Sequence, residues 1–298
     1  MKKFTLLLMS LLMVSIFAVA QKKLCVHTIY GEKIEYIASD VAYIDFEDVT
    51  TEPDDDPVVP ESGSFVAKPF SVSATKTVTF SPGNLQYHPA NDEWRFALSQ
   101  LEYIGNDNAN ISDTYNGWID LFGWGTGNNP TNTSTDYDDY QTFVDWGSNQ
   151  IGSYAPNTWR TLTYNEWEYI IKERSNASNL IGVAQVNGVN GLIILPDGWT
   201  CPNGVTFKSG FEDADGLEYY ASYQTFSASD WDTLEASGAV FLPATGDRYN
   251  SDVYNVQYFG GYWSATEDNS IFLNFSSYGA SMDSASRHYG LSVRLVRD

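Results

Sequence analysis

The segment that most constrains what this 298-residue chain can fold into is residues 47–63. Three prolines, Pro53, Pro57 and Pro60, stand in it among seven acidic residues. Such a composition cannot bury a core, and it resists both helix and sheet. It predicts an extended linker that separates its neighbours by up to about 50 Å. The chain is therefore expected to divide into a short front segment and a long C-terminal domain.

The front segment carries two predicted features. In residues 1–20, Lys2 and Lys3 precede an apolar run that closes on the small-residue pattern of residues 18–20, which is typical of a secretory signal peptide. The run is shorter than the ~20 residues of a membrane-spanning helix. Residues 21–46 alternate like strands around Gly31 and predict a small β-hairpin module. We therefore expect an exported protein, located outside the cell, at the cell surface or in the periplasm.

The charge of the chain limits its partners. Thirty-eight acidic residues stand against 16 basic ones, a formal net charge of −22, which repels nucleic acid and anionic lipid. No stretch after the predicted signal is apolar enough to predict a transmembrane segment. Two cysteines, Cys25 and Cys201, do not make a disulfide scaffold, and the sequence leaves open both their pairing and the oligomeric state.

Residues 64–298 predict one α+β domain with few helices and much irregular structure, because turn signals interrupt an aromatic- and Gly-rich sequence. Thr163 and Glu166 form a capping-box pattern that predicts the start of one helix. Ser229 is the predicted cap of a second helix, which ends just before Gly238. Tryptophans at core-facing positions of the predicted elements are expected to be buried: Trp94, Trp159, Trp167, Trp231 and Trp263.

Alternating apolar residues predict strands at both ends of this domain. Residues 78–80, 85–87 and 94–96 predict a meander, and residues 239–243 predict a strand after the second helix. Residues 271–275 and 291–295 alternate in the same way and are expected to pair as a closing hairpin across the polar loop 276–289.

Several motifs resemble known families. Residues 159–169 resemble the R-L-P-T-x-x-E-W-E-Y segment of formylglycine-generating enzymes, the sulfatase-modifying branch of the C-type lectin-like fold, and residues 260–266 and 290–297 resemble its closing segments. Residues 80–87, 117–125 and 238–244 are similar to secreted Bacteroidetes-type paralogues of the Fibrobacter major paralogous domain group. The resemblance covers most of residues 64–298 and implies a C-type lectin-like domain behind the small β module.

The catalytic chemistry of the resembled enzymes does not carry over. They oxidise a substrate cysteine with copper held by two late cysteines, whereas this chain has no cysteine after Cys201. Cys201 is expected to be a small buried hydrophobic residue. The three histidines, His27, His88 and His288, stand in no recognised catalytic motif. We therefore predict a non-catalytic protein without a cofactor.

Structural calcium is the one metal that the sequence leaves open. Two oxygen-rich loop clusters have the ligand types that calcium prefers, although the sugar-binding calcium motifs of C-type lectins are absent. The candidate ligands are Asp136, Asp138, Asp139, Glu267, Asp268 and Asn269.

The C-terminal loops are the predicted recognition surface, because Tyr, Asn and Asp on loops make adaptable contacts. The candidate residues are Arg248, Tyr249, Asn250, Tyr254, Tyr258, Asn269, Tyr278, Asp283, Arg287 and His288. The sequence thus favours a secreted or surface-exposed recognition module for an extracellular glycan or protein. Two alternatives stay open: a diverged hydrolase or oxidase of the resembled fold, and a structural subunit of a surface assembly.

Overall fold

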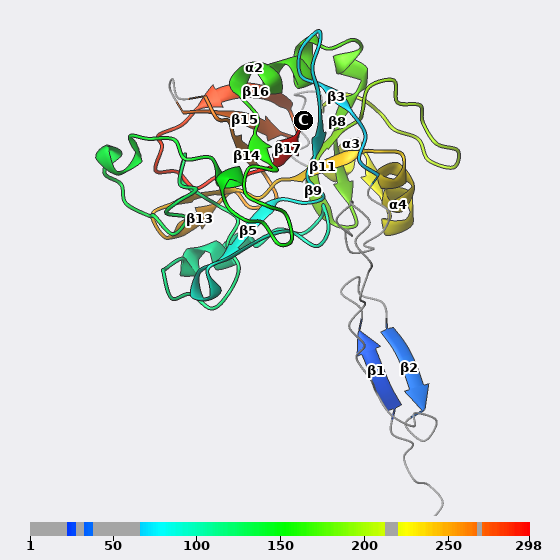
Figure 1. Cartoon of the computed structure of the whole chain (residues 1–298). Coiled ribbons are helices and arrows are strands. Elements are labelled where there is room, and N and C mark those ends of the chain that lie inside the picture. Colours follow the sequence, from blue (N-terminus) through cyan, green and yellow to red (C-terminus); the bar gives the residue numbers. More distant parts are fainter. Residues whose placement is uncertain (1–22, 28–32, 38–65, 212–219, 267–269) are drawn as a thin grey trace, which may run out of the picture. The chain divides into compact units, whose positions relative to one another are not determined.

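The computed structural model describes residues 23–27, 33–37, 66–211, 220–266 and 270–298 (Figure 1). Contacts divide the chain into two units, Met1–Asp56 and Pro57–Asp298. The predicted signal peptide and linker lie outside the described residues. In the first unit, β1 (Lys23–His27) and β2 (Lys33–Ile37) pair antiparallel, with Lys23 opposite Ile37. The predicted hairpin is therefore confirmed for these two strands.

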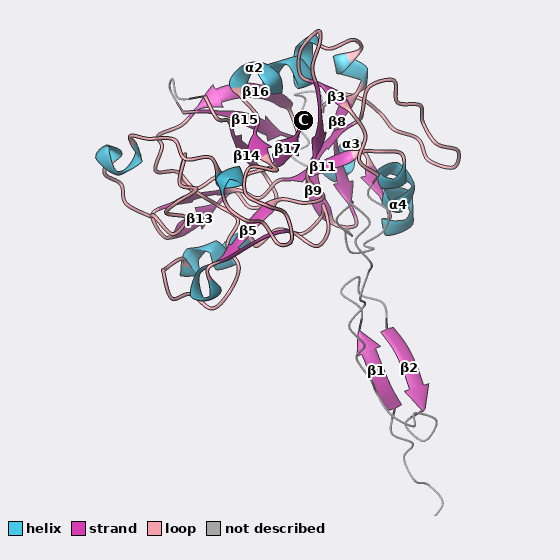
Figure 2. Ribbon diagram, viewed as in Figure 1, coloured by secondary structure: helices cyan, strands magenta, loops and turns pink. Residues whose placement is uncertain are grey.

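The second unit is mixed α+β, with few helices and several small sheets among long loops (Figure 2). This confirms the predicted class at that level. One four-stranded sheet has the order β10 (Thr225–Phe226), β8 (Ile181–Val186), β9 (Val189–Ile194), β11 (Val240–Pro243). A second has the order β3 (Phe70–Ser71), β4 (Thr77–Phe80), β17 (Leu295–Arg297), β7 (Arg160–Thr161).

Three smaller sheets complete the strand content of the described residues. A three-stranded sheet has the order β14 (Gly260–Trp263), β15 (Ile271–Ser276), β16 (Gly279–Ser284). The two hairpins are β5 (Leu85–His88) with β6 (Glu93–Phe96), and β12 (Asp247–Tyr249) with β13 (Asp252–Tyr254). The helices are α2 (Tyr164–Glu168), α3 (Tyr220–Tyr223) and α4 (Ala228–Ala236), and short helical turns include η4 (Tyr137–Tyr140) and the π-helical η6 (Tyr169–Glu173).

The start of α2 is the predicted capping box. The Thr163 hydroxyl accepts from the Glu166 amide, and the Glu166 carboxylate accepts from the Thr163 amide at 2.9 Å. The start of α4 corrects the prediction, because its cap is Ser227 and not Ser229. Ser227 has an acidic residue, Asp230, three positions later, and this spacing is what a capping box requires.

Two strand predictions were wrong. β15 does not pair with residues 291–295; it pairs with the polar strand β16, and Leu295 begins β17 between β4 and β7. In the predicted meander only β5 and β6 pair with each other, because β4 belongs to the sheet that contains β17. In both cases the apolar alternation marked a buried strand correctly but carried no information about its partner.

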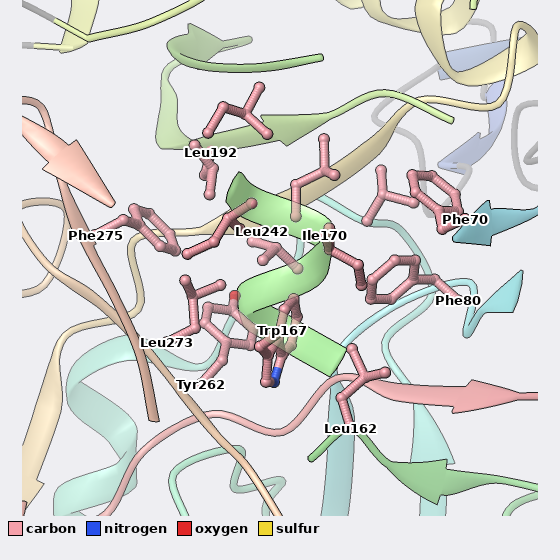
Figure 3. Close-up of a cluster of buried hydrophobic side chains, with 14 of the residues drawn as sticks. Phe70, Phe80, Leu162, Trp167, Ile170, Leu192, Leu242, Tyr262, Leu273 and Phe275 are labelled. Atoms are coloured by element: carbon pink, nitrogen blue, oxygen red, sulfur yellow. The ribbon is translucent and has the colours of Figure 1, made fainter. Parts of the chain in front are cut away.

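The core confirms the predicted burial of all five tryptophans. Trp167 lies in the centre of one cluster, its ring 5.8 Å from that of Phe80, and its indole nitrogen donates to the Trp263 carbonyl (Figure 3). Cys201 corrects the prediction, because it is exposed in an irregular loop, where its thiol contacts the Val205 carbonyl. The tryptophans thus fix a scaffold whose loops are free to carry other side chains.

Candidate functional site

The exposed large hydrophobic side chains are the first evidence for a functional surface. Across the described ranges, every such side chain is a tyrosine: Tyr137, Tyr249, Tyr254, Tyr258 and Tyr278. Four of these were predicted from the sequence. Tyr137 was missed because it stands in the acidic cluster that was interpreted as calcium ligands. A tyrosine at the surface offers an apolar ring and a polar hydroxyl to a partner.

The β12–β13 hairpin carries two of these tyrosines on one face. Asp247 lies opposite Tyr254, and Tyr249 lies opposite Asp252. Because side chains alternate along a strand, all four point to the same side of the hairpin, away from Arg248. Both tyrosine side chains are exposed, as this orientation requires: 37% for Tyr249 and 48% for Tyr254.

Tyr249 is held in place by its neighbours in the last loop. Its ring centroid lies 5.3 Å from His288 and 5.3 Å from Tyr289, and these two rings stack on each other. Partial burial lowers the pKa of His288, which favours the neutral form of the imidazole. We call Tyr249, Tyr254, His288 and Tyr289 the tyrosine face.

Arg248 was predicted as a surface residue, and this was wrong. The side chain is fully buried beneath the hairpin, where its Nη1 donates to the Asn250 carbonyl and its Nη2 lies 3.4 Å from the Leu121 carbonyl. Burial lowers its pKa to about 10. The physical reason is the strand alternation that turns Tyr249 outward and therefore turns Arg248 inward. Arg248 supports the tyrosine face from below.

Arg287 was also predicted at the surface and is buried instead. Its guanidinium lies 4.2 Å from the Trp124 ring centroid and 5.1 Å from that of Tyr137. Its Nε donates to Ser270 and its Nη1 to the Tyr140 carbonyl at 2.7 Å. The stacking surface and carbonyl acceptors of η4 draw the side chain inward. Arg287 therefore anchors Tyr137 next to the loop that carries His288.

An open groove of about 690 Å³ adjoins Tyr137 at the end of the β15–β16 hairpin, where Tyr164 of α2 also lines it. Of the candidate recognition residues, Asp283 lines this groove. Its carboxylate accepts from Asn274 at 3.2 Å and from the Ser284 amide at 2.7 Å. The lining residues are Tyr137, Tyr164, Ser270, Ile271, Met282, Asp283, Ser284, Ala285 and Ser286. Aromatic rings, hydroxyls and one carboxylate thus face the same hollow.

The structure does not bring all predicted residues together. Tyr278 lies in the β15–β16 turn, at the opposite end of this six-residue hairpin from the groove, a distance of roughly 20 Å. The Tyr258 carbonyl contacts Tyr220 of α3. Asn250 lies exposed in the β12–β13 turn with a left-handed backbone, and Asn269 lies outside the described residues.

Two of the candidate calcium ligands, Asp136 and Asp138, have structural roles in η4. Asp136 caps η4 by accepting from the Asp138 amide, and Asp138 accepts from Gln141. Within the described part of the chain, no three such side chains are grouped closely enough to hold a metal ion. Glu267 and Asp268 lie outside it, so calcium in that loop stays a prediction.

Two carboxyl groups have strongly raised pKa values, about 6 for Asp120 and about 7 for Glu235, and burial is the main cause. Asp120 accepts from the Ile104 amide and from Asn108, and Glu235 accepts from Gln100. Neither residue lines the groove. Both carboxyl groups belong to buried hydrogen-bond networks of the core.

No family model, curated protein or solved structure matches this chain. Among the helices that the structure describes, none has the length and apolar character needed to cross a membrane.

Proposed function

We propose that this chain is a secreted or surface-exposed, non-catalytic recognition protein that binds an extracellular glycan or protein through the tyrosine face. The observation that carries the proposal is the division of aromatic residues. The predicted core tryptophans are buried, whereas the large hydrophobic side chains exposed in the described regions are all tyrosines. Single exposed rings are ordinary on soluble proteins, whereas adjacent rings such as Tyr249, His288 and Tyr289 form the kind of patch that marks an interaction site.

The arrangement of the face favours binding. A tyrosine buries a large area on contact and has only two side-chain torsions to restrict. Packing against His288 and Tyr289 restrains Tyr249 further, which lowers the entropy cost of binding. Asp247 and Asp252 beside the rings supply hydrogen-bond acceptors.

We further propose that residues 64–298 have a C-type lectin-like fold of the formylglycine-generating-enzyme type. The mixed α+β architecture supports this proposal. So do the structural roles of the motif residues, since Arg160 pairs with Glu166 at 2.7 Å and Trp167 is buried. In such a domain, loops on a fixed scaffold carry the binding residues.

The test is a screen of the purified full-length chain against panels of glycans and of microbial and host surface proteins, with calcium and with a chelator. We expect saturable binding to at least one member. Clean absence of binding under both conditions contradicts the proposal.

A further inference from the structure

The outer side of the β12–β13 hairpin alternates between acidic and aromatic side chains. On this side Asp247 is followed by Tyr249 along β12, and Asp252 is followed by Tyr254 along β13. Each carboxylate lies opposite a tyrosine of the other strand, so the two acids are diagonal neighbours, and so are the two rings. We call these four side chains the Asp–Tyr checkerboard.

The four groups of the checkerboard lie close to one another. The Tyr254 hydroxyl lies 3.5 Å from Oδ2 of Asp252. The charge of Asp252 raises the pKa of Tyr254, and the charge of Asp247 adds to this effect, because a phenolate beside two carboxylates is unfavourable. Tyr249 is restrained from its other side by the ring of His288, 5.3 Å away. A cation over the centre of the checkerboard would therefore meet two rings and two carboxylates.

No basic side chain neutralises these two acids in the part of the chain that the structure describes. Asp247 accepts from the Asn255 amide at 2.8 Å, and the ion pairs of the described residues include neither Asp247 nor Asp252. Arg248, the one basic residue of the hairpin, is buried on the opposite side. Burial also favours the neutral form of His288. The outer side of the hairpin is therefore an anionic surface with two exposed rings.

The charge of this surface selects among the partners that exposed tyrosines can bind. A neutral glycan stacks on the rings but gains nothing from the two charges, and an anionic partner is repelled by a chain of net charge −22. An arginine matches both kinds of group, because its planar guanidinium stacks on aromatic rings and donates paired hydrogen bonds to carboxylates. Charge complementarity thus favours a protein partner that presents arginine.

We propose that the Asp–Tyr checkerboard binds arginine side chains of a partner protein. The guanidinium lies against the rings of Tyr249 and Tyr254 and donates to the carboxylates of Asp247 and Asp252. The rings supply contact area, and the carboxylates select a cation over a neutral group. This inference rests on the proposed function, since it assigns a partner chemistry to the tyrosine face.

The probe is a glycine–serine nonapeptide with two arginines and a neutral fluorophore. Its comparators carry citrulline, which has the shape of arginine without the charge, or lysine, whose ammonium group does not stack on rings as a guanidinium does. Fluorescence anisotropy measures binding to the full-length chain at about 0.15 M salt, which screens the long-range attraction of the net charge.

We expect the arginine peptide to bind with a dissociation constant on the order of 0.1–1 mM and the citrulline peptide at least about tenfold more weakly. The lysine peptide should lie between them. Absence of arginine-peptide binding, or equal or tighter binding of either comparator, overturns the proposal.

Variants locate the binding on the hairpin. The double variant Asp247→Asn, Asp252→Asn keeps the size of both side chains and removes their charge, and we expect about tenfold weaker binding of the arginine peptide. Glu173→Gln, Asp232→Asn removes the same charge from two exposed residues outside the hairpin and is the matched control, with an expected change of less than about twofold. Equal affinities for the two double variants overturn the proposal.

The panel screen separates this inference from the proposed function. A panel ligand whose binding weakens in the Tyr249→Ala, Tyr254→Ala variant but not in Asp247→Asn, Asp252→Asn overturns the arginine assignment and leaves recognition by the tyrosine face standing. A panel ligand whose binding weakens in both double variants supports the inference.

Discussion

Replacement of Glu235 by glutamine is predicted to remove a large part of the pH dependence of stability. Glu235 lies in the last turn of α4 with 8% of its surface exposed, and its carboxylate accepts from Gln100 at 2.8 Å. Gln100 in turn accepts from Arg294 at 2.7 Å and from the Phe241 amide. A glutamine at position 235 keeps the acceptor for Gln100 but does not ionise.

The direction in which stability changes with pH follows from the raised pKa of Glu235. Burial raises the pKa of Glu235 from 4.5 to about 7 in the folded protein. Its stabilising contribution is therefore complete below the unfolded pKa and is lost as the pH rises through the folded one. The shift corresponds to roughly 3 kcal/mol of unfolding free energy between about pH 4.5 and pH 7.5.

Urea unfolding at several pH values between 5 and 8, followed by tryptophan fluorescence, measures this contribution. We expect the wild type to lose more unfolding free energy than Glu235→Gln as the pH rises. Glu173→Gln, an exposed residue, is the control and should follow the wild type. Parallel pH profiles of the wild type and Glu235→Gln would refute the reasoning.

Two further predictions concern the scaffold. Trp167→Ala should lower the unfolding free energy by about 3–5 kcal/mol, because it empties a fully buried site; a loss below about 1 kcal/mol in denaturant unfolding contradicts the assigned packing. Ser227→Ala should cost about 1 kcal/mol, and Ser229→Ala clearly less, since Ser227 makes the capping box of α4. Equal losses in the same assay would contradict the assignment of the cap.

Local signals in the sequence predicted local structure well. Thr163 and Glu166 determine a helix start within four residues, and Gly238 has the left-handed backbone that the end of α4 requires. The burial of Trp94 followed from strand alternation, since Trp94 and Phe96 are the buried positions of β6. These features depend on neighbours close in sequence, so they are readable without the fold.

The pairing of strands could not be predicted from the sequence. β16 is built mainly of small and polar residues, and its apolar alternation is limited to Ala280 and Met282, which is too short to mark it as the partner of β15. The two arginines of the predicted site show a related limit. Composition favours arginine at the surface, but Arg248 follows the strand period inward, and Arg287 finds an aromatic ring and carbonyl acceptors inside the domain.

The central claim is tested most directly by the affinity of the Tyr249→Ala, Tyr254→Ala double variant for the ligand that the screen identifies. Tyr278→Ala is the matched control, since Tyr278 is 46% exposed but lies in the β15–β16 turn and does not belong to the tyrosine face. We predict at least about 30-fold weaker binding for the double variant and a change of less than about twofold for the control. Equal affinities for all three proteins would contradict the assignment of the tyrosine face.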